Sequence, residues 1–302
     1  MCRFDPCSGH IAGIYSFLFF CSMITFPLAK INLGLHVLNK RSDGFHNIET
    51  IMYPISLFDA LEIVDISKKT EIIIFGNSKQ EIPTEKNLIY KAWKLLFDKH
   101  GIKPVIFNLV KHIPAQAGLG GGSSNAAFAL VLLNDFFKLN LSKDVLKKYA
   151  AEIGSDCPFF IEPKASLVQG RGEKLSPIDL DLSNYYIAIV KPNKLFDGSG
   201  GISTKEAYSI VKPSNDRISL IDIVKKPIEE WKNELVNDFQ KPIQNIHKQI
   251  EDVINQLYRD GAIYAAMSGS GSACFGLFDK KNINLNFDKN YFLHISRLNS
   301  PK

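Results

Sequence analysis

The sequence predicts a mixed protein of helices and strands, of the α/β or α+β class, on three observations. Segments typical of strands alternate with segments of helical period along the whole chain. The composition, 45% hydrophobic and 22% charged, is that of a globular protein and excludes a disordered or collagen-like chain. The length of 302 residues favours one large domain or two of modest size.

Charge and cysteine content narrow the functional classes. Thirty-six basic and 31 acidic residues give a net charge of +5, which is too mild to indicate nucleic acid and suits an anionic small molecule equally well. The five cysteines contain no C-x-x-C pair and give no disulfide framework. We therefore expect reduced thiols, a cytoplasmic location, and neither nucleic acid nor membrane as a partner.

Residues 1–22 stand apart from the rest of the chain. The apolar run at 11–20 is shorter than the roughly 20 residues that a membrane helix needs. Arg3 is offset by Asp5 and no clear cleavage site follows, so the features of a signal peptide are weak. A signal or anchor, and upstream translation ahead of a true start at Met23, both stay open; either way this stretch is an extension.

The first half of the body begins with an extended stretch. It runs from Met23 to Val37 and leads into a polar turn cluster at 39–44. Residues 55–66 and 71–75 are rich in apolar and β-branched types and predict strands. Asn87 is placed to cap a helix that runs through Lys99 and ends at Gly101. Residues 105–113 alternate like a strand.

The pattern continues with two helices, at 123–138 and from Ser142 to 153, and the second closes at Gly154. Residues 185–190 predict a strand that is buried on both faces. Residues 203–206 have the spacing of a capping box. Apolar residues recur at three and four from 243 to 257 and predict one amphipathic helix that ends at Gly261. Strands at 262–267 and 273–277 then flank a Ser-Gly-Ser-Gly-Ser loop.

The strongest chemical signal is a glycine run that leads directly into a helix. It comprises Pro114, Ala115, Gln116, Ala117, Gly118, Leu119, Gly120, Gly121, Gly122, Ser123 and Ser124. Glycine lets successive backbone N–H groups converge, and a helix beginning there adds unpaired donors and the positive end of its dipole. The segment predicts a phosphate cradle, although a flexible glycine loop is the simpler alternative. It lacks the lysine of a P-loop and the third glycine of a dinucleotide fingerprint.

Asp156 lies between a helix stop and Pro158, with apolar residues on both sides. A carboxylate fixed in such a partly dry turn could accept a hydroxyl proton, or could simply cap the next turn.

Lys30 and Asn32 interrupt an apolar strand on one face. Lys30 alone is best explained as a lysine on a wet edge strand, but beside Asp156 it would keep that carboxylate ionised and stabilise charge on a transferred phosphoryl group.

Two further segments have open interpretations. Gly269 and Ser270 lie in the loop at 268–272, which could approach a phosphate or simply form a hairpin turn. His46 follows Asp43-Gly44-Phe45 and is either structural or a ligand contact.

Taken together, these segments resemble the GHMP kinase superfamily, which includes galactokinase, homoserine kinase and mevalonate kinase. Within it the chain is most similar to the family of 4-diphosphocytidyl-2-C-methyl-D-erythritol kinases. The resemblance rests on residues 29–33, 41–46, 87–89, 118–127, 153–158, 170–173 and 268–271.

The resemblance implies an α+β fold of two domains. We expect a ribosomal-protein-like α/β domain at 23–180 and a smaller, ferredoxin-like domain at 181–302. It further implies an ATP-dependent kinase for the 2-hydroxyl of the cytidyl substrate in the non-mevalonate route to isoprenoids. Mg²⁺ would accompany ATP, but the sequence identifies no protein ligand for the metal. We expect a monomer or a weak homodimer.

The resemblance also assigns roles to residues. Asp156 would be the base and Lys30 its partner, residues 114–124 would wrap the triphosphate, and Gly269 and Ser270 would approach the phosphates. Asn87 and Lys111 would lie near the adenine, whereas Asn32, Phe45, His46 and Thr204 would hold the substrate. Phe45 replaces the usual tyrosine, so its ring is kept without the hydroxyl. Cys157 is expected to pack rather than react.

Three alternatives stay open. The first is a sister kinase that acts on a mevalonate-like or homoserine-like alcohol. The second is a catalytically silent nucleotide-binding regulator on the same fold. The third and weakest is a dehydrogenase, because the dinucleotide fingerprint fails.

Overall fold

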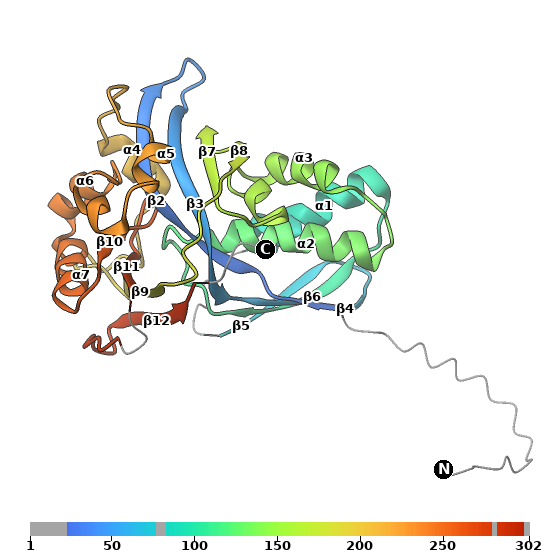
Figure 1. Ribbon diagram of the computed structural model, residues 1–302. Helices are drawn as coiled ribbons and strands as arrows, with labels where there is room; N and C mark the ends of the chain where they lie inside the picture. The colour runs from blue at the N-terminus through green and yellow to red at the C-terminus, as the bar shows by residue number, and fades with distance from the viewer. Residues whose placement is uncertain (1–22, 77–82, 280–282, 299–302) are drawn as a thin grey trace, which may run out of the picture.

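The structure is a computed structural model that describes residues 23–76, 83–279 and 283–298. The extension at 1–22, with three of the five cysteines, lies outside these residues. Within them the strands form three four-stranded sheets (Figure 1). The expected α+β class is confirmed.

A long hairpin forms the centre of the molecule. Strands β2 (Leu28–Lys40) and β3 (His46–Phe58) pair antiparallel, and β7 (Ser166–Gly170) and β8 (Lys174–Pro177) extend the sheet in the order β2-β3-β7-β8. The polar cluster at 39–44 supplies the turn, in which Arg41 N donates to the Phe45 carbonyl at 2.8 Å. The hairpin runs between the two halves of the molecule (Figure 1).

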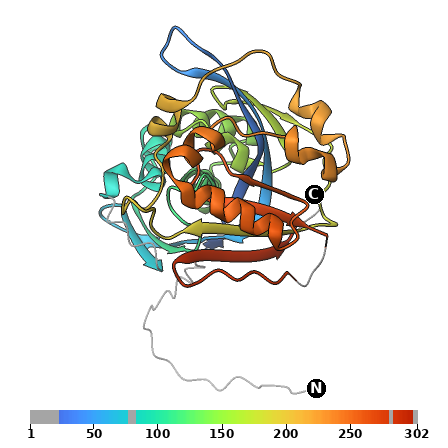
Figure 2. The ribbon, with the colours of Figure 1, turned by 90° about the vertical axis from the view of Figure 1, so that its left-hand side faces the viewer.

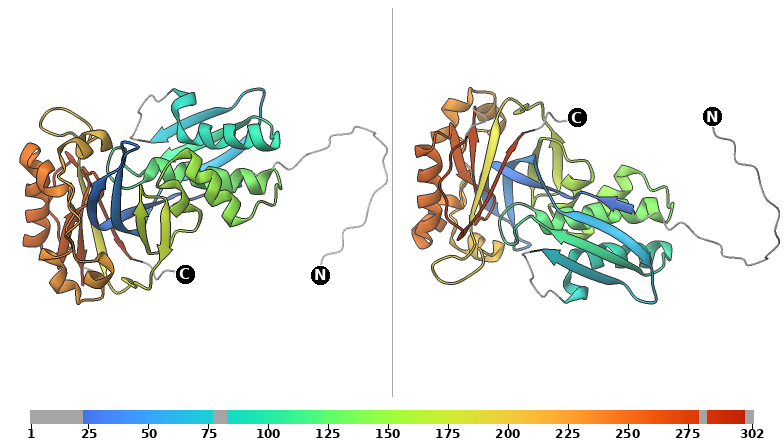
Figure 3. Two further views of the ribbon diagram at one scale, coloured as in Figure 1. Left: turned by 90° about the horizontal axis from the view of Figure 1, so that it is seen from above. Right: turned by 90° about the horizontal axis from the view of Figure 1, so that it is seen from below.

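The amino-terminal half adds a second sheet with helices on one face. Its strands are β1 (Met23–Thr25), β4 (Ala60–Ile66), β6 (Val105–Lys111) and β5 (Glu71–Gly76), in the order β1-β4-β6-β5. Helices α1 (Leu88–His100), α2 (Gly121–Phe136) and α3 (Lys143–Ile153) lie over it. Figure 3 shows the helices from above and the sheet from below. Short 3₁₀ turns, η1 (Thr84–Lys86) and η2 (Cys157–Ile161), precede α1 and follow α3.

The carboxy-terminal half is a sheet covered by helices on its outer side (Figure 2). Strands β9 (Tyr186–Pro192), β10 (Tyr264–Met267), β11 (Cys274–Phe278) and β12 (Tyr291–Arg297) are antiparallel, in the order β10-β11-β9-β12. The helices are α4 (Thr204–Ile210), α5 (Leu220–Val224), η3 (Ile228–Asn233), α6 (Gln240–Ile246) and α7 (Lys248–Arg259). Helix α7 buries Ile250, Val253 and Leu257 against this sheet.

Three predicted helix starts are confirmed by their caps. The side chains of Asn87, Ser142 and Ser203 accept hydrogen bonds from the N–H groups of Ile89, Val145 and Glu206 at 3.0, 3.4 and 3.1 Å. Each satisfies one donor that the first turn leaves unpaired. Gly101 ends α1 with φ at +65°, the left-handed conformation that glycine adopts most readily.

Two segments that the sequence predicts as single elements are each divided into two in the structure. The strand expected at 55–66 is two strands, because at Asp59 the backbone N–H leaves the ladder and donates to the Pro27 carbonyl at 2.8 Å. The helix expected at 243–257 is also two helices. His247, with φ at −118° and ψ at +81°, has non-helical backbone angles and separates α6 from α7. Strands β7, β8 and β12 have no counterpart among the predicted elements.

The two halves share one hydrophobic core. Ile31 and Tyr53 of the central hairpin pack with Ile189 and Phe275 of the carboxy-terminal sheet, and all four are buried. The division at residue 180 therefore stays a prediction. Across 23–76, 83–279 and 283–298, no helix has the length and apolar character needed to cross a membrane.

Candidate active site

A cavity of about 850 Å³ lies where the glycine loop, the central hairpin and the loop at 268–272 meet. Every predicted site residue except Ser124 lines it. These are Lys30, Asn32, Phe45, His46, Asn87, Lys111, Pro114, Ala115, Gln116, Ala117, Gly118, Leu119, Gly120, Gly121, Gly122, Ser123, Asp156, Thr204, Gly269 and Ser270. Ser124 is fully buried behind the loop. The structure thus gathers segments from both halves of the chain around one space.

The glycine loop presents the start of a helix to this cavity. Helix α2 begins at Gly121, two residues earlier than expected, with Gly120 as N-cap at φ +71°. The first intrahelical bond runs from Ser124 N to the Gly120 carbonyl at 2.8 Å. The N–H groups of 121–123 therefore lack helical partners and, with the dipole, suit an anion such as a phosphate.

Gly118 lies in close contact with the loop at 268–272 from the other half of the chain. Its φ is +71°, and a Cβ built there would lie 1.9 Å from the Ser268 carbonyl oxygen. The Ser268 hydroxyl donates to the Gly118 carbonyl at 2.9 Å, and Ala273 N donates to the Ala117 carbonyl at 3.2 Å. Only glycine fits this contact, which couples the glycine loop to the loop at 268–272.

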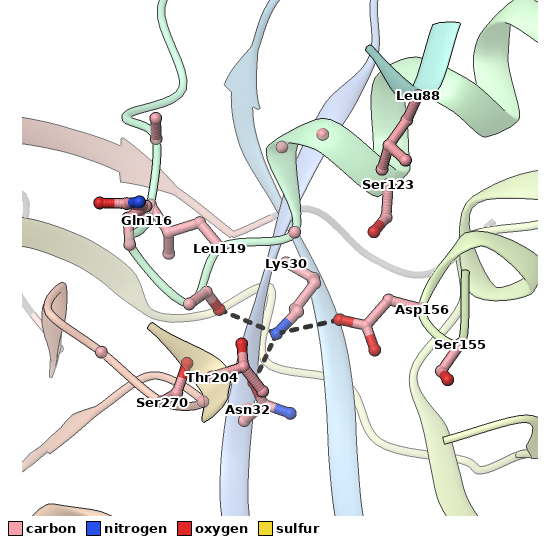
Figure 4. Close-up of a pocket in the computed structure, with 18 of the residues that line it drawn as sticks. Lys30, Asn32, Leu88, Gln116, Leu119, Ser123, Ser155, Asp156, Thr204 and Ser270 are labelled. Carbon is pink, nitrogen blue, oxygen red and sulfur yellow. Dashed lines mark hydrogen bonds and ion pairs between the residues drawn. The ribbon is translucent and has the colours of Figure 1, made fainter. Parts of the chain in front are cut away.

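Lys30 projects from β2 beneath the glycine loop, with only 3% of the residue exposed. Its Nζ donates to Asn32 Oδ1 at 2.6 Å and to the Gly118 carbonyl at 2.8 Å, and it lies 3.8 Å from Asp156 Oδ2 (Figure 4). Burial lowers the pKa of Lys30, and the charge of Asp156 partly opposes that shift. The alternative of a lysine on a wet edge strand is wrong.

Asp156 follows the end of α3 and stands at the N-cap position of η2. Its side chain makes no capping hydrogen bond there and is 34% exposed. The capping alternative therefore does not describe this carboxylate, which lies on the cavity wall opposite Lys30 (Figure 4). Cys157 next to it is buried, and burial raises the pKa of its thiol to about 12, so it packs rather than reacts at neutral pH.

Lys111 and Asp59 form a buried ion pair at the entrance to the glycine loop. The Asp59 side chain is fully buried and pairs with Lys111 Nζ. Its Oδ1 also accepts from the backbone N–H groups of His112 and Ile113, each at 2.8 Å. Burial lowers the pKa of Lys111, and Asp59 opposes that shift. Asp59 is not among the predicted site residues, yet it fixes the backbone just before Pro114.

The other end of the cavity is aromatic. Phe45 is 52% exposed, and the Arg171 guanidinium lies 5.0 Å from its ring centroid. His46 stacks on Tyr208, with ring centroids 5.0 Å apart and an interplanar angle of 16°. Burial raises the pKa of Tyr208 to about 12, so its hydroxyl stays protonated at neutral pH. The aromatic rings can stack on a planar ring of a ligand, and the Arg171 guanidinium can bind an anion.

Sequence reasoning missed several residues that contribute to the site. Tyr208 lies four residues after Thr204 on α4, so the two side chains lie on the same face of the helix. This spacing could have identified Tyr208 from the sequence. Arg171 lies within the Gly-Arg-Gly-Glu segment, which carries the resemblance but no predicted role. Asn87 uses its side-chain oxygen to cap α1, so its amide nitrogen is left for a ligand. The Asn32 oxygen accepts from Lys30 and its amide nitrogen donates to Thr50, which leaves one amide hydrogen of Asn32 for a ligand.

The described part of the chain contains no cluster of three His, Cys, Asp or Glu side chains that could hold a metal ion. The oxygen donors on the cavity wall include the Asp156 carboxylate and the Ser123 hydroxyl. This donor set suits Mg²⁺ that keeps most of its ligands on phosphate and water, because Mg²⁺ needs only one or two protein oxygens.

Comparison with known proteins places both halves of the chain in one family. The model of the GHMP kinases N terminal domain matches residues 87–162, and that of the GHMP kinases C terminal matches residues 220–285.

Curated relatives match over most of the chain. A 4-diphosphocytidyl-2-C-methyl-D-erythritol kinase of Bacteroides fragilis is 48% identical over 258 residues, which are 85% of this chain and 92% of the relative. The enzyme of that name from Parabacteroides distasonis is 49% identical with the same coverage.

Solved structures agree. A crystal structure of 4-(cytidine 5'-diphospho)-2C-methyl-D-erythritol kinase superposes with a TM-score of 0.69 at 30% identity, covering 84% of this chain and 90% of the other. Homoserine kinase from Cytophaga hutchinsonii gives a TM-score of 0.66 at 16% identity, covering 96% of this chain and 98% of the other, and shows the shared fold alone.

Proposed function

This chain belongs to the GHMP kinase family, and we propose that its glycine loop, Lys30 and Asp156 carry out the phosphoryl transfer of that family. The chain is an ATP-dependent small-molecule kinase. Its reaction is phosphorylation of the 2-hydroxyl of 4-diphosphocytidyl-2-C-methyl-D-erythritol, a step of non-mevalonate isoprenoid synthesis. The observation that carries the residue assignment is the approach of Lys30 Nζ to Asp156 Oδ2, 3.8 Å apart beside the glycine loop.

The proposed step is an in-line transfer. The Asp156 carboxylate accepts the proton of the 2-hydroxyl while that oxygen forms a bond to the γ-phosphorus of ATP. The bond from the γ-phosphorus to the β–γ bridging oxygen breaks, and ADP leaves. The N–H groups at 121–123 and the Lys30 ammonium stabilise negative charge on the phosphoryl oxygens, because they are already oriented before the reaction. Residues 114–124 with Gly269 and Ser270 hold the triphosphate.

The finer assignments follow from position in the cavity. Mg²⁺ bound to ATP would neutralise phosphate charge, and Asp156 and Ser123 on the cavity wall would supply protein oxygens to it. Asn87 and Lys111 would lie beside the adenine. Asn32, Phe45, His46 and Thr204 would hold the cytidyl substrate, with Phe45 stacking near the cytosine. Monomer or weak homodimer, cytoplasmic location, and the absence of nucleic-acid and membrane partners stay predictions.

The test is substrate competition in one assay. The chain from Met23 onward is incubated with MgATP and either the cytidyl substrate, mevalonate or homoserine, and ADP and phosphorylated product are measured. We expect product from the cytidyl substrate alone. Turnover of mevalonate or homoserine instead would favour a sister kinase, and ATP binding without transfer to any of the three alcohols would favour a silent regulator.

A further inference from the structure

Thr50 lies on the wall of the cavity, in the middle of β3. The residue is fully buried, and it borders the cavity next to Asn32. It lies outside both residue ranges that the family models match. Its hydroxyl makes two hydrogen bonds, one as donor and one as acceptor. Which group donates in each bond determines how the Asn32 side chain is oriented.

The first partner is the carbonyl of Gly34, which a β-bulge makes available. Leu33 pairs with Ile51 and Leu35 pairs with Thr50, so Gly34 is an extra residue in β2. Its φ is +67°, and a Cβ there would meet the Leu220 side chain at 2.7 Å. The bulge takes Gly34 out of the strand pairing, and the Thr50 hydroxyl donates to its carbonyl at 2.6 Å.

The second partner is Asn32. A hydroxyl has one hydrogen, and Thr50 gives it to Gly34, so the same oxygen can only accept from Asn32. Asn32 Nδ2 donates to it at 3.0 Å. This fixes the orientation of the Asn32 amide, because its nitrogen faces Thr50 and its oxygen must face Lys30 Nζ, 2.6 Å away.

The orientation of the amide in turn sets the position of the ammonium. Lys30 gives one proton to Asn32 Oδ1 and a second to the Gly118 carbonyl, which leaves its third proton on the side of Asp156. A reversed amide would place an NH₂ group against the ammonium and remove one of its two anchors. Figure 4 shows Asn32 and Asp156 on different sides of the Lys30 Nζ.

We propose that Thr50 is a positioning residue for phosphoryl transfer: its hydroxyl orients the Asn32 amide and thereby holds the Lys30 ammonium in register with Asp156 and the glycine loop. The proposal rests on the proposed function of Lys30 and Asp156. Thr50 touches neither reacting group and acts through Asn32.

The test compares three substitutions at this position by steady-state kinetics. Thr50→Val keeps the shape and removes the hydroxyl, and we expect kcat to fall roughly 10- to 100-fold, the loss that accompanies a disrupted hydrogen bond to a charged group. KM for ATP and for the cytidyl substrate should change less than about threefold, because the glycine loop, Phe45, His46 and Thr204 keep their positions. Thr50→Ser keeps the hydroxyl and should hold kcat within about threefold of wild type. Thr50→Ala repeats the loss in a smaller side chain if valine packs poorly.

Thr70→Val is the matched control, because Thr70 is a buried threonine just ahead of β5 and does not line the cavity. Its hydroxyl accepts a long hydrogen bond from Val105 N, at 3.4 Å. This variant should keep wild-type kcat. The proposal is overturned if Thr50→Val and Thr50→Ala keep wild-type kcat, if Thr50→Ser loses as much as they do, or if KM rises in parallel. Failure of the proposed function looks different: the wild-type chain then shows no transfer, or Asp156→Asn turns over normally.

Discussion

At the scale of single residues, the charge of Lys30 depends on its surroundings more than on its type. An exposed lysine is solvated on all sides, whereas Lys30 is buried between Asn32, the Gly118 carbonyl and Asp156. Two hydrogen bonds and one carboxylate replace water around the ammonium, yet burial still lowers its pKa. The protonated form is the one that can stabilise phosphoryl oxygens, so activity is tied to this equilibrium.

This gives a prediction for the pH dependence of turnover. Because the pKa of Lys30 is below the ordinary lysine value of 10.5, the ammonium loses its proton at lower pH than an exposed lysine. We expect kcat to fall on the alkaline side before pH 10.5 is reached. In Lys30→Arg the guanidinium stays charged throughout this range. That variant should be slower at neutral pH but should show no corresponding alkaline fall.

The measurement is kcat against pH for both proteins at saturating substrates. Lys111 also has a lowered pKa, so its titration must be distinguished from that of Lys30. Its proposed place is beside ATP. Its titration should appear in KM for ATP rather than in kcat. An identical alkaline fall in Lys30→Arg would show that another group titrates.

The role of a site residue could be predicted from the sequence where it depended on the residues next to it in the chain. Asp156 between a helix stop and a proline, and Lys30 two residues from Asn32 in an apolar strand, could be singled out, and the structure brings these residues together. Thr50 could not be, because its hydroxyl matters only through the Gly34 bulge in the neighbouring strand. The same holds for Asn32, whose oxygen is used by Lys30 before any ligand arrives.

At the scale of elements, Asp59 connects four strands. It stands between β3 and β4, its backbone N–H bonds Pro27 ahead of β2, and its carboxylate holds Lys111 of β6 and the next two N–H groups. The apolar residues that continue on both sides of Asp59 favour one unbroken strand at 55–66. The break exists because a buried carboxylate with three donors is more stable there than continued pairing.

Replacing Asp59 should therefore be costly. Asp59→Asn leaves Lys111 buried without its counter-charge and turns an amide group toward it. We expect a loss of about 3–5 kcal/mol in the free energy of unfolding, the range measured when one member of a buried ion pair is removed. KM for ATP should also rise, since the backbone leading into the glycine loop loses its anchor.

Urea denaturation and ATP kinetics check this expectation. Asp65→Asn is the matched control on β4, because Asp65 is exposed and its carboxylate accepts from the adjacent Ile66 N. It should change the free energy of unfolding by less than about 0.5 kcal/mol. Equal stability of the two variants would contradict the role given to Asp59.

At the scale of the whole molecule, the site lies where the two halves meet. Gly118 and Ser268 are 150 positions apart in sequence and are joined by a direct hydrogen bond. The alternation of strands and helices predicted the fold class, and the glycine run predicted one wall of the cavity. The meeting of the two loops depends on the shared core and could be expected only from the family resemblance.

The shared core predicts that both halves unfold together. Trp93 packs in the amino-terminal core and Trp231 in the core common to both halves, and the chain has two tryptophans in all. Trp231→Phe leaves Trp93, which reports from the amino-terminal core, and Trp93→Phe leaves Trp231, which reports from the shared core. In each, we expect the urea midpoint by fluorescence to coincide with the midpoint of the same variant by far-UV circular dichroism. Separate midpoints would show that the halves unfold independently.

In the proposed reaction, Asp156 takes the proton of the alcohol while Lys30 and the glycine loop hold the phosphoryl group. A single-turnover measurement of Asp156→Asn with saturating MgATP and cytidyl substrate isolates this transfer step. We expect an ATP dissociation constant like that of wild type and a transfer rate reduced by about 10²- to 10⁴-fold, the contribution of a general base. A transfer rate close to that of wild type would contradict this proposal.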